Sequence, residues 1–314
     1  MKPALGGIHH ITALASDPQR NIDFYAGFLG LRLVKKTVNF DAPDVYHFYY
    51  GNETGRPGTL LTFFPFPDAA KGKRGVGEIA AVAFSVPAGS MDYWVDRLAG
   101  HAIDFNGPLQ RFGEPVVSFE DPDGMVIELV GDAAAERLPG GKDASVGVAH
   151  VPRSLHGATF AESHDKIAGE FLSQTLGLRP VGREGNRSRY LIGDGPAAAK
   201  IDLLSRPDGN PARQSAGSVH HIAWRVATAE GQLAWRETLV QGGTSVTSVQ
   251  DRMYFRSIYF REPGGILFEI ATDGPGMLID ESQEELGSHL KLPPWLEAGR
   301  ARLEERLIPV RLPR

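Results

Sequence analysis

Two pairs of adjacent histidines and one glutamate are the residues of this sequence best suited to metal chemistry. The pairs are His9-His10 and His220-His221, and the glutamate is Glu269. The 314 residues include no cysteine, which excludes thiolate metal sites, iron–sulfur clusters, disulfides and thiol nucleophiles. Two imidazoles and one carboxylate with further open positions would suit non-haem Fe(II) that activates O2, with Mn(II) as the alternative metal.

The chain contains four copies of one pattern, and the histidine pairs recur within it. Each copy opens with a strand pattern, continues with a stretch whose apolar residues recur at spacings of three and four, and ends with short β-rich runs separated by glycine and proline. The copies span residues 5–67, 77–132, 153–206 and 217–275. The sequence therefore predicts an α+β fold in which four tandem βαβββ modules form two open β-barrels.

Two segments fall outside the repeat. Residues 133–152 are rich in alanine, glycine and proline and are predicted to link the two halves of the chain. Residues 276–314 contain an acidic run, the segment LKLPPW and a charged stretch with helical character. We expect this C-terminal helical tail to be a packing or oligomerisation arm.

The histidine pairs occupy the same place in the repeat, on the opening strands of copies one and four. At this place copy two has two alanines, and copy three has a histidine followed by a glycine. Because side chains alternate between the two faces of a strand, we expect one histidine of each pair to face the barrel interior and the other to face the opposite surface. His10 and His221 are the predicted inward pair.

A carboxylate in a closing strand completes the predicted site. Glu269 lies in the last strand of copy four, and the matching positions in the other copies hold Thr62, Glu128 and Asp202. If copies one and four close into one barrel, His10, His221 and Glu269 converge on a single metal. Copies two and three would then form a second barrel without a histidine at the inward position, and that half is predicted to be structural.

Two other histidines could enter the ligand set. Pairing copies three and four would make His156 the third ligand, but His156 matches His9 and not His10 in the repeat. A shift by one residue turns a side chain to the other face of the strand. His47, in the run VYHFYYG, is a further candidate ligand and otherwise a core or rim residue.

The charge balance and hydropathy argue against nucleic-acid and membrane partners. The 33 basic and 38 acidic residues give a net charge of −5, whereas nucleic-acid binders usually carry a basic excess. No apolar run approaches the roughly 18 residues that suggest a membrane span, and the N-terminus lacks a signal-peptide pattern. We therefore expect a cytoplasmic protein. Exposed β edges and the tail favour a homo-oligomer, a dimer or larger.

Several segments resemble the vicinal-oxygen-chelate superfamily, which includes glyoxalase I, extradiol ring-cleaving dioxygenases and bleomycin-resistance proteins. Four modules in one chain resemble the dioxygenases most, and the closer similarity is to the branch that acts on hydroquinones, chlorinated ones included. The segments that carry this resemblance are GIHHIT, NIDFYAGFLGLRLVKKTVNFD, YHFYYGNETGRPGTLLTFFPFP, SVHHIAWRV and LKLPPWLE.

The resemblance implies roles for particular residues. Carried over by position, the metal ligands of the branch fall on His10, His221 and Glu269, as the repeat also predicts. The residues that would contact substrate fall on His9, Thr12, His220, Arg252 and Tyr259. Arg252 and Tyr259 differ in parity, so a bend or bulge around Phe255-Arg256 would be needed to bring both side chains to one site.

The resemblance also implies a reaction. We expect an Fe(II)-dependent dioxygenase that opens the ring of a small hydroquinone-type substrate with O2 as co-substrate. In this reaction His9 or His220 would transfer protons, Arg252 would stabilise oxyanion charge and Tyr259 would donate a hydrogen bond. Two alternatives stay open at this point. One is a glyoxalase I-like isomerase or lyase, which would usually use a fourth protein ligand where Thr62 stands, and the other is a catechol extradiol dioxygenase.

Overall fold

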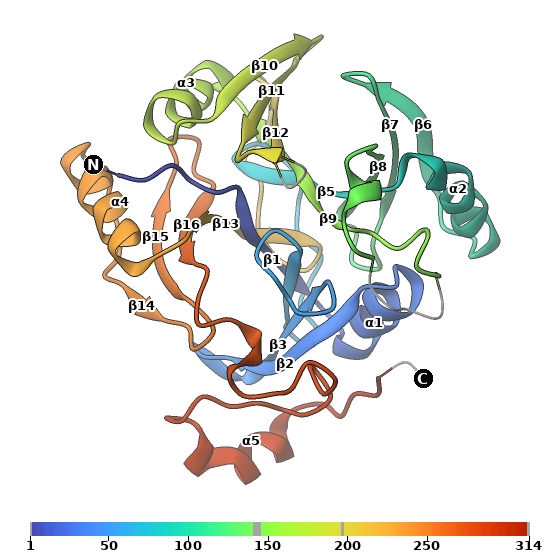
Figure 1. Cartoon of the computed structure of the whole chain (residues 1–314), viewed down its shortest axis with the longest axis vertical. Helices are drawn as coiled ribbons and strands as arrows, with labels where there is room; N and C mark the ends of the chain where they lie inside the picture. Colours follow the sequence, from blue (N-terminus) through green and yellow to red (C-terminus); the bar gives the residue numbers. More distant parts are fainter. Residues whose placement is uncertain (1, 141–145, 196–197, 313–314) are drawn as a thin grey trace.

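The protein folds as four βαβββ modules in chain order (Figure 1). The structure is a computed structural model that describes residues 2–140, 146–195 and 198–312. The first module is β1 (Ile8–Ala15), α1 (Pro18–Ile22), β2 (Arg32–Asn39), β3 (Ala42–Gly51) and β4 (Leu60–Pro65). The second is β5 (Glu78–Val86), α2 (Met91–Gly100), β6 (Phe105–Arg111), β7 (Glu114–Glu120) and β8 (Val126–Gly131).

The other two modules follow a segment that connects the halves of the chain. The third module is β9 (Ser154–Glu162), α3 (Asp165–Glu170), β10 (Arg179–Glu184), β11 (Arg187–Ile192) and β12 (Ala199–Ser205). The fourth is β13 (Ser218–Val226), α4 (Ala229–Gln241), β14 (Gln250–Asp251), β15 (Arg256–Arg261) and β16 (Leu267–Thr272). Part of the predicted linker, residues 141–145, lies outside the described residues.

The strands form two curled eight-stranded sheets, which confirms the predicted fold class. The first sheet has the order β14-β15-β16-β13-β1-β4-β3-β2 and so joins the first and fourth modules. The second has the order β10-β11-β12-β9-β5-β8-β7-β6 and joins the second and third modules. The alternative that pairs the third and fourth modules is therefore wrong.

The strand register reproduces the repeat position by position. In every module the opening strand runs parallel to the closing strand and pairs with it directly. The four equivalent pairs are Thr12–Thr62, Ala83–Glu128, Thr159–Asp202 and Ala223–Glu269. Glu269 therefore occupies the same place in the first sheet that Glu128 and Asp202 occupy in the second.

Both histidine pairs lie at β-bulges in the ladder between β1 and β13. The extra residue is His9 in β1 and His220 in β13. A bulge sets two residues against one on the neighbouring strand and re-aims their side chains. As a result the two rings of each pair lie side by side, with centroids 5.1 Å apart in both cases. The expectation that the histidines of a pair face opposite surfaces is therefore wrong.

The helices flank the two sheets, and two of them begin at capping side chains (Figure 1). Asp17 accepts a hydrogen bond from the amide of Arg20 at the start of α1, and Thr228 accepts one from the amide of Gly231 at the start of α4. Two of the predicted helical stretches continue as π-helical turns, at Asp23–Phe28 and Phe171–Thr175. Within the described ranges, no helix is long and apolar enough to cross a membrane.

The C-terminal tail packs along β2 and β3 of its own chain (Figure 1). It is mostly irregular, and its helix α5 spans only Arg300–Arg306. Lys35 of β2 is fully buried and donates to the carboxylates of Asp280 and Glu281. A buried ammonium group is tolerated only when it is paired, so these contacts attach the start of the tail to the first module. A role of the tail in oligomerisation stays a prediction.

Two buried carboxyl groups lie where the two sheets meet. Glu162 ends β9 of the second sheet, and Glu262 follows β15 of the first. Glu162 is 1% exposed, and its Oε1 has no hydrogen-bond partner among the described residues. Burial and the neighbouring charge of Glu262 raise the pKa of Glu162 to about 8. The Glu162 carboxyl group is therefore mostly protonated at neutral pH.

We expect Glu162→Gln to stabilise the protein at alkaline pH. The pKa is raised in the folded state, so the folded protein binds the proton more tightly and stability falls as pH rises from about 4.5 to about 8. The neutral amide avoids this loss, which amounts to a few kcal/mol at about 1.4 kcal/mol per pKa unit. Thermal unfolding at pH 5 and pH 9 measures the effect, with the exposed Glu170→Gln as control. An identical pH dependence in Glu162→Gln and the wild type would contradict it.

Candidate metal centre

His10, His221 and Glu269 each bring one atom to a single buried point. His10 Nε2 lies 3.2 Å from His221 Nε2 and 3.4 Å from Glu269 Oε2. His221 Nε2 lies 2.9 Å from the same carboxylate oxygen. The three residues come from β1, β13 and β16, which are neighbours in the first sheet. The residues predicted as metal ligands are thus brought within ligand distance of one another.

A hydrogen bond from His9 sets the tautomer of His10. His9 Nε2 lies 3.1 Å from the carbonyl oxygen of Thr272, which can only accept, so His9 carries its proton on Nε2. Burial lowers the pKa of His9 to about 3, and the neutral ring accepts at Nδ1. His10 Nδ1, 2.9 Å away, must therefore donate to it. This leaves His10 Nε2 with a free lone pair directed to the other two ligand atoms.

The second histidine pair repeats this arrangement. The Nδ1 atoms of His220 and His221 lie 2.8 Å apart. Ser257 of β15 donates to Oε1 of Glu269, which leaves Oε2 facing the two histidines. Glu269 Oε2 has no hydrogen-bond partner among the described residues. Ser257 was not anticipated from the sequence, although its strand pairs directly with that of Glu269 and so passes beside it.

These observations fit a bound divalent cation. Burial alone would raise the pKa of Glu269, and positive charge on the neighbouring His10 and His221 would lower it well below its usual range. With His10 Nε2 unprotonated, a bound cation would supply that positive charge. An ionised carboxylate oxygen and two imidazole nitrogens then share one buried point. Three lone pairs this close repel one another unless a cation lies between them. The donor set, two imidazoles and one carboxylate, suits Fe(II) or Mn(II).

His9→Leu is expected to lower metal affinity by about 10- to 100-fold, the loss typical of removing a partner of a metal ligand. Leucine cannot accept the proton of His10 Nδ1, so the metal-binding tautomer is no longer favoured. His9→Asn places an amide oxygen close to the lost Nδ1 and should restore most of the affinity. Competition with a chelator measures the dissociation constants. If His9→Leu and His9→Asn lost the same amount of metal affinity, the affinity would depend on the packing of the His9 side chain and not on its hydrogen bond to His10.

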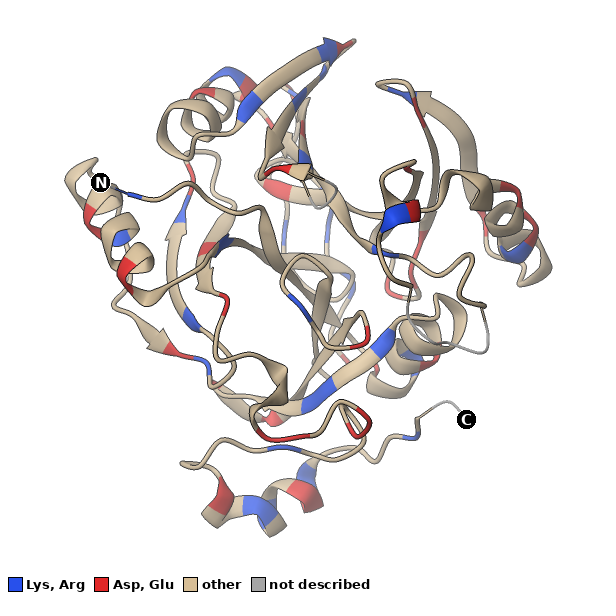
Figure 2. Cartoon of the chain, viewed as in Figure 1, with Lys and Arg blue, Asp and Glu red and all other residues tan. Residues whose placement is uncertain are grey.

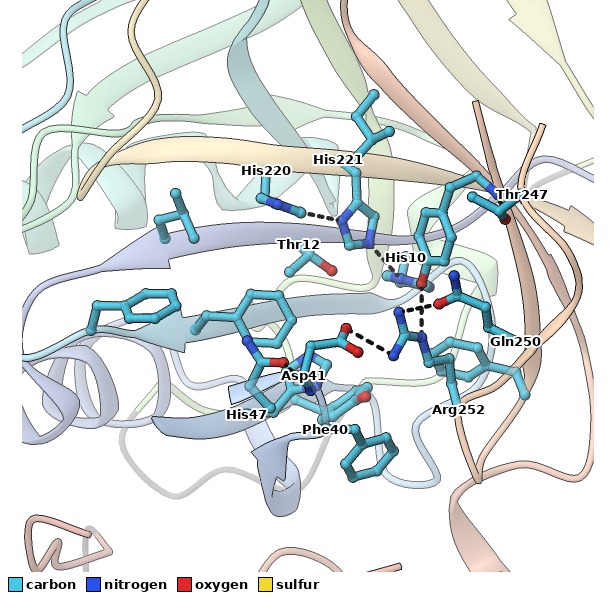
Figure 3. Close-up of a pocket in the computed structure, with 18 residues that line it drawn as sticks. His10, Thr12, Phe40, Asp41, His47, His220, His221, Thr247, Gln250 and Arg252 are labelled. Atoms are coloured by element: carbon cyan, nitrogen blue, oxygen red, sulfur yellow. Dashed lines mark hydrogen bonds and ion pairs between the residues drawn. The ribbon is translucent and has the colours of Figure 1, made fainter. Parts of the chain in front are cut away.

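The ligand atoms adjoin a cavity of about 670 Å³ (Figure 3). Its wall includes His10, His221 and four of the five residues expected to contact substrate. These four residues are Thr12, His220, Arg252 and Tyr259. The fifth, His9, has both ring nitrogens engaged, by His10 and by the carbonyl of Thr272. Both nitrogens of His9 are thus engaged within the protein, and its role in proton transfer stays a prediction.

Arg252 is held in the cavity by three acceptors (Figure 3). Its Nε donates to the Tyr259 hydroxyl at 3.2 Å, and its terminal nitrogens reach Gln250 Oε1 at 2.5 Å and Asp41 Oδ2 at 3.0 Å. Asp41 belongs to the turn between β2 and β3, so this ion pair joins the first module to the fourth. Neither Asp41 nor Gln250 was anticipated from the sequence, because no local pattern marks residues that meet only across a barrel.

A turn explains how Arg252 and Tyr259 reach one site. β14 and β15 form an antiparallel pair, and residues 252–255 connect them. Met253 has φ of +64°, a left-handed conformation that reverses the chain. Arg252 and Tyr259 therefore do not share one regular strand, and their difference in parity does not separate them. The bend expected near Phe255-Arg256 is present as this turn.

Thr62 occupies the position that Glu269 holds in the fourth module, and its hydroxyl is hydrogen-bonded. Thr62 Oγ1 lies 2.8 Å from Thr12 Oγ1 and 2.9 Å from His47 Nε2. The ring of His47 packs between Tyr49 and Phe64, with centroid distances of 4.0 and 4.3 Å. Burial lowers the pKa of His47 well below its usual value. His47 is thus a neutral residue of the cavity wall that is bonded to Thr62.

A second acidic cluster lies in the other sheet, but cationic side chains already neutralise it. Glu114, Asp132 and His156 are close enough to share a metal. Arg189 lies 2.5 Å from Glu114, and Lys200 lies 3.1 Å from Glu114 and 3.6 Å from Asp132. The cavity beside this cluster, which is lined by His156, Arg189 and Lys200 but not by Glu114 or Asp132, measures only about 10 Å³. Lys and Arg are interspersed with Asp and Glu through the fold (Figure 2), and in this cluster the buried Arg189 is paired with Glu114.

The residues that match Glu269 in the second sheet are also paired with arginines. Glu128 Oε2 lies 2.8 Å from Arg111, and Asp202 accepts from Arg189 at 2.7 Å and Arg187 at 3.2 Å. Guanidinium groups there provide the positive charge that a metal would provide in the first sheet. A structural role for the second half stays a prediction of the sequence.

The chain is similar to known proteins over nearly its full length. The model of the Glyoxalase/Bleomycin resistance protein/Dioxygenase superfamily matches residues 7–129 and 160–270. MhqO of Bacillus subtilis (strain 168), provisionally named a ring-cleaving dioxygenase, is 46% identical over 308 residues, which cover 96% of each chain. The chlorohydroquinone/hydroquinone 1,2-dioxygenase of Sphingobium indicum is 38% identical over 302 residues, 93% of this chain and 92% of that protein.

A solved structure is similar in fold as well as in sequence. It is a crystal structure of a protein from Bacillus subtilis subsp. subtilis str. 168, provisionally named a dioxygenase. The two chains superimpose with a TM-score of 0.93 at 42% identity, and the match covers 99% of each. The whole fold described above, tail included, is therefore shared with that protein.

Proposed function

The chain belongs to the glyoxalase/bleomycin resistance protein/dioxygenase superfamily, and from this membership we propose that it is a non-haem Fe(II)-dependent dioxygenase that opens a hydroquinone-type ring, chlorinated or not, with O2. It is an enzyme of the ring-cleaving dioxygenase type, like relatives that are 38% and 46% identical to it over nearly the whole chain. The observation that carries the metal-dependent proposal is the convergence of His10 Nε2, His221 Nε2 and Glu269 Oε2 within 3.4 Å.

The three ligands would hold the metal at the cavity wall and leave positions open for substrate. Bound there, Fe(II) would make a phenolic hydroxyl more acidic and allow electrons to pass from the ring to O2. Arg252 faces the same cavity with a permanent positive charge, so it would stabilise negative charge on a substrate oxygen. Mn(II) is the alternative metal, because it accepts the same donor set.

Tyr259 and His220 can hold protons at defined atoms. The Tyr259 oxygen accepts from Arg252 Nε, its hydroxyl also interacts with Ser257, and its hydrogen would be donated to a substrate oxygen. Burial raises the pKa of Tyr259, which keeps it protonated as a donor. His220 lines the cavity, and burial lowers its pKa to about 3, so its ring is neutral. If its Nδ1 accepts from His221 as His9 does from His10, its Nε2 carries the proton and can donate a hydrogen bond to a substrate oxygen. Thr12 also lines the cavity and would contact the aromatic ring of the substrate.

The state of Thr62 favours the dioxygenase over the glyoxalase-like alternative. A fourth protein ligand would come from the position of Thr62 in the first module. Its hydroxyl is bonded to Thr12 and His47 at 2.8 and 2.9 Å, and a neutral hydroxyl is a weaker metal ligand than a carboxylate. A three-residue set keeps positions open for both substrate and O2.

Metal content and O2 uptake together test the proposed function. The protein is loaded anaerobically with Fe(II), Mn(II) or Zn(II) and then mixed with hydroquinone, chlorohydroquinone or catechol in aerated buffer. We expect one metal per chain, O2 uptake in equal amount to the hydroquinone consumed, and both atoms of 18O2 in the product. A preference for catechol would favour the extradiol alternative. Isomerase activity with Zn(II) and no O2 uptake would favour the glyoxalase-like alternative.

We also propose that the enzyme works in the cytoplasm as a homo-oligomer on a small aromatic substrate, without nucleic-acid or membrane partners. The acidic net charge of −5 supports the absence of nucleic-acid partners. Light scattering of the purified protein tests the oligomeric state.

A further inference from the structure

The cavity beside the proposed metal site is much larger than a bare aromatic ring requires. Its volume is about 670 Å³, whereas a cavity of about 150 Å³ is enough to hold benzene. Cavities of about 300 to 1,000 Å³ usually accommodate ligands the size of drug molecules. A hydroquinone with only hydrogen or chlorine on the ring would leave most of this space to water.

The extra space extends along the strands away from the ligand atoms. His10, Thr12 and Leu14 are alternate residues of β1, and all three line the cavity. Leu14 lies four residues beyond His10, which corresponds to about 13 Å along a strand. Leu14 pairs with Phe64 of β4, and both lie at the same end of the sheet. A ring held at His10 would therefore not reach Leu14 without a substituent.

The far end of the cavity is an apolar wall, formed by residues from three strands and the segment after β4. These residues are Leu14, Phe64, Phe66 and Leu267. All four are only half-buried, although the residues beside them, such as Ala13, Phe63 and Phe268, are fully buried. The wall thus exposes apolar surface inside the cavity, and covering that surface with an apolar group is favourable.

Arg252 and Asp41, the charged side chains that line the cavity together with neutral polar ones, form an ion pair with each other. Arg252 bonds to Gln250, Tyr259 and Asp41 at 2.5 to 3.2 Å. The apolar wall lacks such groups among its own four side chains. The nearest polar rings are those of His47 and His220, with centroids 4.3 and 6.0 Å from that of Phe64. A substituent on the wall itself would meet mainly carbon atoms, and a charged or strongly polar one would lose its hydration there.

We infer that the substrate is a hydroquinone with an apolar substituent of several carbon atoms, which lies on the wall formed by Leu14, Phe64, Phe66 and Leu267. This inference rests on the proposed function for the position of the ring. It adds the chemical class of the substituent, which the superfamily membership does not specify. Each methylene placed on the wall should strengthen binding about three- to fourfold.

Binding and turnover are measured with one series of compounds: hydroquinone and its 2-methyl, 2-propyl and 2-pentyl derivatives. Anaerobic calorimetric titration of the metal-free protein gives dissociation constants that depend on neither metal nor turnover. We expect the dissociation constant of the 2-pentyl derivative to be at least tenfold lower than that of the 2-methyl derivative. The Fe(II)-loaded protein should show a parallel rise in kcat/KM for O2 uptake.

Phe66→Ser and Leu267→Gln are expected to abolish the dependence on chain length in both measurements. Leu109→Gln, a change at a 60% exposed leucine of the second sheet, controls for nonspecific adsorption of longer chains and should keep the dependence. Flat dissociation constants across the series, or an equal dependence in Phe66→Ser and wild type, would overturn the inference. Chain-length-dependent binding without O2 uptake from any compound would instead refute the proposed function and leave the apolar site standing.

Discussion

His10→Ala is expected to remove the bound metal and the O2-consuming activity together. His10 supplies one of three ligand atoms, and its Nε2 lies within 3.4 Å of both others. Alanine leaves one imidazole and one carboxylate, too few protein ligands to hold a divalent ion against water. We expect metal affinity to fall by more than about 100-fold, the upper limit for loss of a mere partner of a ligand. Metal analysis after dialysis and O2 uptake with hydroquinone measure both effects.

His156→Ala is the matched control for His10→Ala. It removes a buried histidine at the equivalent bulge of the second sheet, where His156 is the extra residue opposite β5. We expect this variant to keep one metal per chain, even if loss of its contacts with Glu114 and Asp132 lowers stability. Circular dichroism confirms folding of both variants. If His10→Ala kept its metal and His156→Ala lost it, the functional site would lie in the second sheet.

Arg252→Met is expected to reduce kcat/KM by about 100-fold while metal content stays the same. The guanidinium group is the permanent positive charge among the residues that line the described cavity, and removal of one preorganised donor to a developing oxyanion typically costs about 100- to 1,000-fold. Methionine keeps much of the length of the side chain but not its charge. Arg252→Lys should recover only part of the activity, because an ammonium group cannot bond to Gln250, Tyr259 and Asp41 at once.

Asp41→Asn separates the charge of Arg252 from its ion pair. Asp41 is 73% exposed, and such surface ion pairs contribute about 0 to 1 kcal/mol. We therefore expect kcat/KM to change by less than about fivefold in Asp41→Asn. A loss as large as that of Arg252→Met would mean that Arg252 acts mainly by fastening the β2–β3 turn to the fourth module. Steady-state kinetics with hydroquinone, on protein of verified metal content, distinguish the two roles.

Much of the fold could be predicted because each copy of the repeat is recognisable from patterns among neighbouring residues. Strand and helix periodicity and the turns after each closing strand need only neighbouring residues, and four copies of the pattern reinforce one another. The equivalence of Glu269, Glu128 and Asp202 follows from the same alignment, and the strand register reproduces it. The pairing of modules could be predicted for a different reason, since only one pairing brings His10, His221 and Glu269 into one sheet.

The orientation of the histidine pairs could not be predicted from the same patterns. Alternation along a strand holds only where the ladder is regular, and a bulge depends on how the neighbouring strand is registered. His9 and His220 are both extra residues in the ladder between β1 and β13. Those strands are about two hundred residues apart in the chain, so no local signal in either one marks the bulge. The same holds for Arg252 and Asp41, which meet only across the barrel.

The amino-acid types alone restricted the metal site to histidine and carboxylate, because the chain has no cysteine, and the repeat selected which of them could meet. Tertiary structure alone decided the hydrogen bond that sets the tautomer of His10, the support of Glu269 by Ser257, and the size of the cavity. The physical reason is the separation along the chain of the residues that determine each property. Ligand identity and strand periodicity are properties of the residues themselves, whereas tautomers, ion pairs and cavity shape arise from contacts between strands that only the closed sheet brings together.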